Sequence, residues 1–87
     1  MTWFSERRLD FIDFRLLTAG TIRRDHLMAT FDVSQSQASA DLAAFEREHP
    51  GAMRYDKSGK AYVPANGRYV SQRGIKRAKT LVFEIAG

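Results

Sequence analysis

The chain has no cysteine among its 87 residues. Disulfides and cysteine zinc sites are therefore excluded, and a reducing compartment fits this composition. No stretch approaches the roughly 18 consecutive apolar residues that a membrane span needs. The opening residues, MTWFSERR, carry charges where a secretory signal would be apolar. We therefore expect a cytoplasmic protein with one small hydrophobic core.

Reactive side chains are also scarce. The only two histidines, His26 and His49, lie far apart, and neither belongs to a nucleophile or metal-binding pattern. Asp10 and Asp13 are one helical turn apart, but an ion pair on the surface or between helices explains them better than acid–base catalysis. A catalytic pocket would also consume much of a small core. We expect a protein that is not an enzyme and holds no metal or cofactor.

The positive charge is concentrated at one end of the chain. Residues 1–65 hold nine basic and nine acidic residues, whereas residues 66–87 hold five basic residues and one acid, which gives the net charge of +4. This asymmetry suits a polyanionic partner such as nucleic acid, and a solvated helix face is the alternative. We divide the chain into a domain at 1–65 and a basic C-terminal extension at 66–87, which is a candidate dimerisation helix.

Apolar periodicity predicts three helices over the first fifty residues. Ser5 is the expected N-cap of the first helix, which Gly20 closes. Thr21 is the expected cap of a second helix that ends before residues 31–33. Ser34 caps a third helix running to about Glu48.

Residues after Pro50 and Gly51 switch to strand character. A short strand at 53–55, a turn at 56–59 and a returning strand at 60–63 predict a hairpin. Helix, helix, helix, hairpin is the order of a winged helix-turn-helix, which is mainly α with a small β-hairpin. Beyond it, the spacing of Ile75, Ala78, Val82 and Ile85 fits a C-terminal helix, although residues 81–85 fit a strand equally well.

Residues 21–47 have the pattern of a helix-turn-helix that reads DNA. Val33 packs in the turn, Ala38 supplies the small residue where the helices cross, and Leu42 continues the inward face. The first outward turns then present short polar residues to base edges: Gln35, Ser36, Gln37, Ser39 and Ala40. A glutamine amide matches the N6 and N7 edge of adenine. The alternative is that the two glutamines only solvate an exposed helix.

A second set of residues is suited to the DNA backbone. Hydroxyls at the starts of the second and third helices, basic residues in the first turn of the second helix, and the hairpin tip border one face. These candidates are Thr21, Arg23, Arg24, Ser34, Lys57, Ser58 and Lys60. The expected partner is double-stranded DNA.

Two runs, RLDFIDFRL at residues 8–16 and VSQSQASADL at 33–42, resemble the winged helix domain of WYL-domain transcriptional regulators. Pro50-Gly51, Tyr55-Asp56 and Lys60-Ala61-Tyr62 fall where that family has its wing, so the match covers residues 6–64. The resemblance implies a repressor-like DNA binder. The family includes repressors that are encoded beside phage-defence genes, form dimers and bind inverted repeats. No part of this chain corresponds to the WYL domain, so ligand-controlled release is not implied. Met1 and the short tail favour a natural stand-alone relative over an excised domain.

A homodimer is expected because one helix-turn-helix covers only a half-site. Two sets of residues are candidates for the dimer interface: the aromatic residues Trp3, Phe4, Phe11 and Phe14, and the C-terminal stripe Ile75, Ala78, Val82 and Ile85. Both sets equally suit the core of a monomer. Another interpretation is a winged helix that binds protein, as an antitoxin-like or adaptor module. A third is a non-specific DNA binder that depends on the basic tail.

Overall fold

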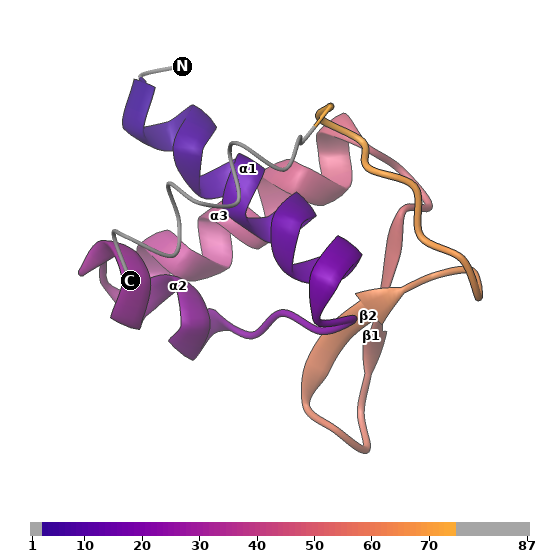
Figure 1. Cartoon of the computed structure of the whole chain (residues 1–87). Helices are drawn as coiled ribbons and strands as arrows, with labels where there is room; N and C mark the ends of the chain where they lie inside the picture. Colours follow the sequence, from indigo (N-terminus) through magenta and orange to yellow (C-terminus); the bar gives the residue numbers. More distant parts are fainter. Residues whose placement is uncertain (1–2, 75–87) are drawn as a thin grey trace.

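A computed structural model describes residues 3–74 of the chain (Figure 1). These residues form helices α1 (Trp3–Thr18), α2 (Arg24–Phe31) and α3 (Gln35–Glu48), followed by strands β1 (Met53–Asp56) and β2 (Ala61–Pro64). The two strands pair antiparallel as a hairpin beside the helices. The predicted winged helix is confirmed. The predicted C-terminal stripe, residues 75–85, lies outside the described residues. Within residues 3–74, no helix is long and apolar enough to span a membrane.

The core lies where the three helices meet and extends to the base of the hairpin. Phe45 of α3 is its largest fully buried side chain, and Ala38, which was predicted to face inward, is also fully buried. Full burial of a large apolar side chain contributes roughly 1.5–3 kcal/mol. The core cluster consists of Leu9, Phe11, Ile12, Leu16, Ile22, Leu27, Ala38, Leu42, Phe45 and Met53.

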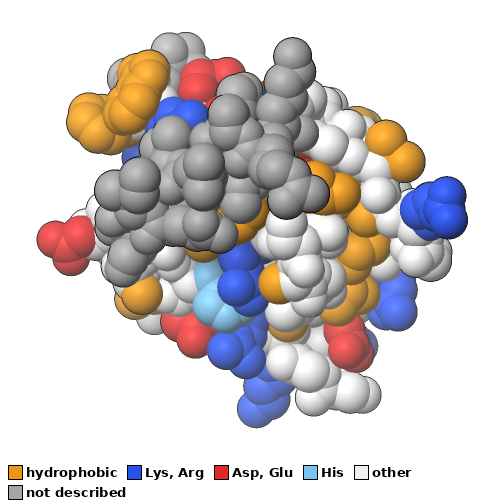
Figure 2. All heavy atoms as spheres, viewed as in Figure 1, with side chains coloured by type: hydrophobic (Ala, Val, Ile, Leu, Met, Phe, Trp, Pro, Cys, Tyr) orange, Lys and Arg blue, Asp and Glu red, His pale blue; other side chains and the backbone are white. Residues whose placement is uncertain are grey.

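The start of α1 differs from the prediction. The helix already includes Trp3, so Ser5 is not its N-cap but lies inside its first turns, where its hydroxyl accepts a hydrogen bond from Arg8 at 3.4 Å. Trp3 and Phe4 are both 66% exposed, and Figure 2 shows hydrophobic side chains projecting where α1 begins. Phe11, by contrast, is buried in the core. At the other end Gly20 has a φ of +73°, which confirms its predicted role in closing the helix.

The start of α2 is also different. The backbone of Ile22 pairs with that of Tyr62 on β2, with N–H to O distances of 3.0 and 2.9 Å. This bridge keeps the chain extended beyond Thr21, so the prediction of Thr21 as N-cap is wrong and Arg23 takes that position. The backbone N–H of Arg23 donates to Nδ1 of His26 at 3.0 Å, so a histidine imidazole satisfies one of the unpaired amides at this helix end.

The turn between α2 and α3 matches the sequence. Asp32 adopts a left-handed conformation (φ +54°), which aspartate tolerates better than most side chains and which turns the chain sharply. Val33 packs partly buried against the core. The Ser34 hydroxyl accepts the backbone N–H of Gln37 at 3.1 Å, so Ser34 is the N-cap of α3 as predicted.

The wing is the hairpin formed by β1 and β2. Its register pairs Tyr55 with Tyr62, and β2 begins one residue later than predicted because Lys60 lies in the turn with a φ of +52°. Asp56 accepts the backbone N–H of Ser58 at 3.1 Å, which tightens the turn. Lys57, Ser58 and Lys60 are all exposed there.

After the wing the chain returns to the helices and binds to α1 through Asp13. The fully buried Asp13 carboxylate accepts hydrogen bonds from the Tyr69 and Ser71 hydroxyls (both 2.6 Å) and from the backbone N–H groups of Gln72 (3.0 Å) and Arg73 (2.9 Å). Burial and the bond to Asp13 raise the pKa of the Tyr69 hydroxyl far above its usual value. Asp13 is therefore a buried hydrogen-bond acceptor and not part of a surface ion pair.

Arg73 completes this attachment. Its guanidinium donates to Glu6 (2.7 Å), Asp10 (2.8 Å) and Glu48 (3.0 Å), and so joins the N-terminal half of α1 to the end of α3. Asp10 is ion-paired, but not on the surface or between helices as predicted: it is buried, and its partners are Arg7 of the same helix and Arg73, which follows the wing. One basic residue of the C-terminal segment is thus bound to carboxylates of the domain itself.

Candidate nucleic-acid interface

The outward face of α3 carries most of the predicted base-reading residues. Gln35, Ser36 and Ala40 are exposed, and Ser39 is half-buried beside them. The inward side of the same helix is anchored by Ala38, Leu42 and Phe45 in the core. The helix therefore presents short polar and methyl groups on a rigid support.

Gln37 is placed differently. Its side-chain amide donates to Asp41 at 2.9 Å, and the other oxygen of that buried carboxylate accepts a hydrogen bond from Nε of Arg8 on α1 at 2.7 Å. Gln37 is half-buried as a result. Its amide is engaged in the contact between α1 and α3 and is not grouped with Gln35 and Ser36.

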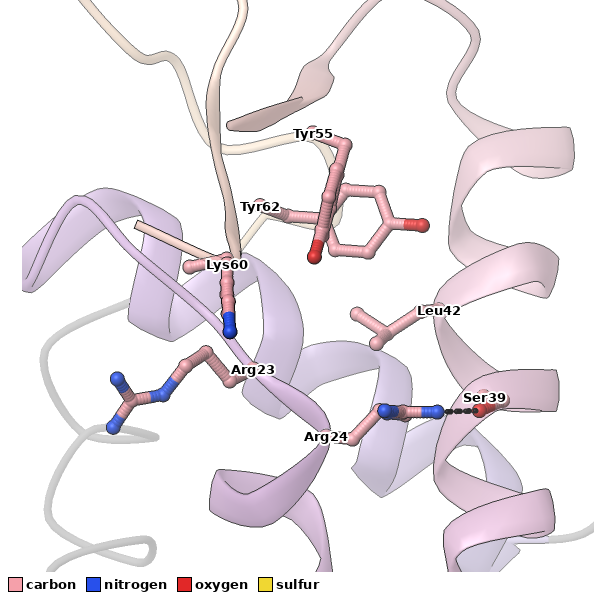
Figure 3. Close-up of a pocket in the computed structure, with 8 residues that line it drawn as sticks. Arg23, Arg24, Ser39, Leu42, Tyr55, Lys60 and Tyr62 are labelled. Carbon is pink, nitrogen blue, oxygen red and sulfur yellow. Dashed lines mark hydrogen bonds between the residues drawn. The ribbon is translucent and has the colours of Figure 1, made fainter. Parts of the chain in front are cut away.

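The two arginines at the start of α2 point in different directions (Figure 3). Arg24 extends onto α3, where its Nη1 lies 3.5 Å from the Ser39 hydroxyl. Arg23 points the other way and pairs with Asp25 at 3.2 Å. The sequence predicted the same role for both arginines, but in the structure only Arg24 reaches from α2 to α3.

A groove separates α3 from the wing. Its deeper part is a hollow of about 350 Å³ lined by Arg23, Arg24, Ser39, Leu42, Tyr55, Lys60, Ala61 and Tyr62. A shallower hollow shares Arg23, Arg24 and Lys60 and continues to Gln35. The groove thus connects the wing to the first exposed residue of α3.

Positive charge dominates this region. Arg23, Arg24 and Lys60 line both hollows. The half-buried His26 lies nearby, and burial together with the Arg15 guanidinium lowers the pKa of its imidazole. Figure 2 shows Lys and Arg side chains gathered beside a histidine in the lower part of the view. The groove is therefore suited to an anionic ligand.

Two tyrosines of the wing were not anticipated as site residues. The Tyr55 and Tyr62 rings pack edge to face with centroids 5.2 Å apart, and both border the deeper hollow (Figure 3). Burial, with Glu46 nearby, raises the pKa of Tyr62, so its hydroxyl stays protonated and able to donate at neutral pH. A tyrosine in a strand usually indicates packing, so the sequence offered no signal for a second role.

The other residues that were predicted to contact the DNA backbone do not lie together in the structure. Thr21 does not stand at a helix start, and its carbonyl accepts a hydrogen bond from Nε of Arg15 at 3.2 Å. The Ser34 hydroxyl is occupied by its cap bond to Gln37. Lys57 and Ser58 remain exposed at the tip of the wing.

Comparison with known proteins places this geometry in a family. Residues 5–70 match the family model of the BrxR transcriptional regulator winged helix-turn-helix domain. The chain is also similar to proteins named DNA-binding transcriptional repressor CapW, with 43% identity over 60 residues to that of Escherichia coli (strain KTE188), 43% over 61 residues to that of Stenotrophomonas maltophilia and 38% over 60 residues to that of Pseudomonas aeruginosa.

These alignments cover 69–70% of this chain but 20% of each relative, so the chain spans about a fifth of the length of the relatives it matches. The resemblance drawn from residues 6–64 is confirmed for the winged helix domain. Because the family model covers well over half of the sequence, the chain belongs to the family of BrxR-type winged helix-turn-helix domains of transcriptional regulators.

Proposed function

We propose that this protein binds double-stranded DNA with α3 in the major groove and acts as a transcriptional repressor. The observation that carries the proposal is the exposed polar face of α3, bordered by a groove to which α2 and the wing contribute Arg24 and Lys60. The relatives named as DNA-binding transcriptional repressors support the same function. A cytoplasmic location accompanies this proposal.

Base reading is assigned to Gln35, Ser36 and Ala40. Gln35 is exposed at the first turn of α3, where a bidentate contact to adenine is worth roughly 1–3 kcal/mol of discrimination. Ala40 offers a methyl group to thymine. Gln37 is assigned a supporting role, because its amide is already bound to Asp41.

The test is selection of bound sites from random duplexes, followed by affinity measurements at several salt concentrations. We expect a defined site and a log K that falls by about 0.9 per phosphate contact as log salt rises. The Gln35→Ala variant should lose its preference at one base pair, whereas Gln37→Ala, the matched control, should keep it. Weak, salt-insensitive binding without sequence preference would instead favour a winged helix that binds protein.

We further propose that the protein binds an inverted repeat as a homodimer, because a single α3 covers a half-site. The side chains of Trp3 and Phe4, each 66% exposed at the start of α1, supply apolar surface for pairing. Light scattering coupled to size exclusion should give a dimer mass that falls in the Trp3→Ser, Phe4→Ser double variant. A wild-type protein that stays monomeric at high concentration would contradict the dimer.

A further inference from the structure

We propose that Arg24, Ser39, Lys60 and Tyr62 form a seat for one phosphate of the DNA backbone, between α3 and the wing. The inference rests on the proposed function and makes it specific. A single phosphate would be held jointly by α2, α3 and β2 with its preceding turn.

The shape of the site favours a phosphate over a base. Base edges lie on the floor of the major groove, so they are reached by side chains that protrude from a helix. A hollow of about 350 Å³ instead receives a group that protrudes from the DNA. The sugar–phosphate backbone is that protruding part of a duplex.

The chemistry of the walls agrees. The Arg24 guanidinium has five N–H donors, of which Ser39 engages one, and Lys60 has three. The Ser39 hydroxyl accepts from Arg24 and so can direct its own hydrogen toward an incoming oxygen. Tyr62 also lines the hollow, with its hydroxyl directed toward α3 (Figure 3). Among the described residues that line this hollow there is no acid, so Arg24 and Lys60 give it a positive charge that attracts an anion.

Arg23 also lines the hollow but is the weaker candidate. Its Nε is 3.2 Å from Asp25, which offsets its charge, and its side chain points away from Ser39. This makes Arg23 a matched control for Arg24. The two residues are adjacent, identical in type and both exposed.

The seat is preorganised by contacts beneath it. The Ile22–Tyr62 backbone bridge holds the wing against the start of α2, two residues before Arg24. Leu42, almost fully buried, lines the hollow from α3 and presents an apolar surface beside the polar groups. A phosphate bound here would fix the wing relative to α3, and so the register in which Gln35 and Ser36 meet the bases.

The test is a set of thermodynamic cycles between protein variants and duplexes that carry one methylphosphonate, an uncharged replacement for a phosphate. The duplex is the one recovered by selection, and each phosphate is neutralised in turn. For the wild-type chain we expect one position where neutralisation weakens binding roughly 10-fold, the size of a charged hydrogen-bond contact. Arg24→Gln and Lys60→Gln should each reduce the effect of neutralising that same position, because one of its two charged partners is lost. In the Arg24→Gln, Lys60→Gln double variant the effect should fall below about 2-fold.

Controls and contrary results are distinct. Arg23→Gln and Lys57→Gln should keep the full effect of neutralisation at that position, and Tyr62→Phe should reduce it partly. The shared seat alone would be overturned if Arg24 and Lys60 were coupled to different phosphates, or to none. In that case the wild type would still bind its site with a steep salt dependence. Absence of salt-dependent DNA binding by the wild type would overturn the proposed function as well. Unchanged urea midpoints would show that the variants are folded.

Discussion

Replacing Asp13 with asparagine is expected to destabilise the domain by roughly 2–4 kcal/mol. The substitution keeps the size of the side chain and changes only its charge and hydrogen bonding. In the native chain one carboxylate oxygen accepts from Tyr69 and Gln72, and the other accepts from Ser71 and Arg73. An amide has one oxygen and one NH₂ group, so it can accept on one side only.

The magnitude follows from counting what is lost. In either amide orientation, the NH₂ group faces a backbone N–H, that of Gln72 or that of Arg73, and leaves it unpaired at a cost of about 1–3 kcal/mol. The hydroxyl on that side can rotate to accept. The bonds that survive change from charge-assisted to neutral and lose about half their strength, roughly 1 kcal/mol in all. For a domain of this size, the sum corresponds to a fall in Tm of roughly 10–25 °C.

Urea unfolding followed by far-UV circular dichroism measures this loss. Tryptophan fluorescence is a poor probe, because the single tryptophan, Trp3, is largely exposed in the folded chain. Asp25→Asn is the matched control: that carboxylate is on the surface, and its pair with Arg23 is expected to contribute less than about 1 kcal/mol. An Asp13→Asn stability within about 0.5 kcal/mol of the wild type would refute the view that this carboxylate holds the segment after the wing.

Other substitutions test other parts of the structure. Gln37→Ala should lower the free energy of unfolding by about 1 kcal/mol through loss of its bond to Asp41, whereas Gln35→Ala should leave it unchanged, as urea titrations would show. Ala38→Leu should cost about 1–3 kcal/mol because Ala38 is fully buried in the core, and equal midpoints would contradict that packing. Burial lowers the pKa of His26 below 6.5, so the unfolded chain binds the proton first as the pH falls. The stability from this group should be complete above about pH 6.5 and decline below it, and His26→Gln, which can keep the cap bond, should remove that part of the pH dependence of unfolding.

The elements that sequence patterns predicted well depend on neighbouring residues. The Ser34 cap and the inward placement of Ala38 and Leu42 follow from hydrogen bonding and periodicity within one helix. The start of α2 could not be predicted in the same way. Thr21 is a good local cap, but pairing of Ile22 with Tyr62, forty residues later, keeps the chain extended past it.

The candidate site shows the same limit. The exposed face of α3 was predictable, because helical spacing places Ser36 and Ala40 nearly opposite the buried Ala38. The different directions of Arg23 and Arg24 were not, since adjacent residues of one type carry no signal for which will meet α3. The buried role of Asp13 was also beyond reach, because its partners lie more than fifty residues away.

Net charge is a poor guide to the DNA-facing surface of this protein. By count, residues 1–65 are neutral and the excess of positive charge falls in residues 66–87. Yet Arg73, from that second segment, is held by carboxylates of α1 and α3. Within the neutral part, Asp13 and Asp41 are buried in hydrogen bonds to the chain itself, whereas Arg24 and Lys60 line an open groove. Folding buries three of the nine acids in residues 1–65, namely Asp10, Asp13 and Asp41, and leaves Arg24 and Lys60 exposed. A domain whose charges cancel in sum thus gathers bases in a groove beside α3. If the proposed phosphate seat is correct, removing Arg24 or Lys60 should therefore weaken DNA binding more than removing a base that follows the wing, such as Arg68.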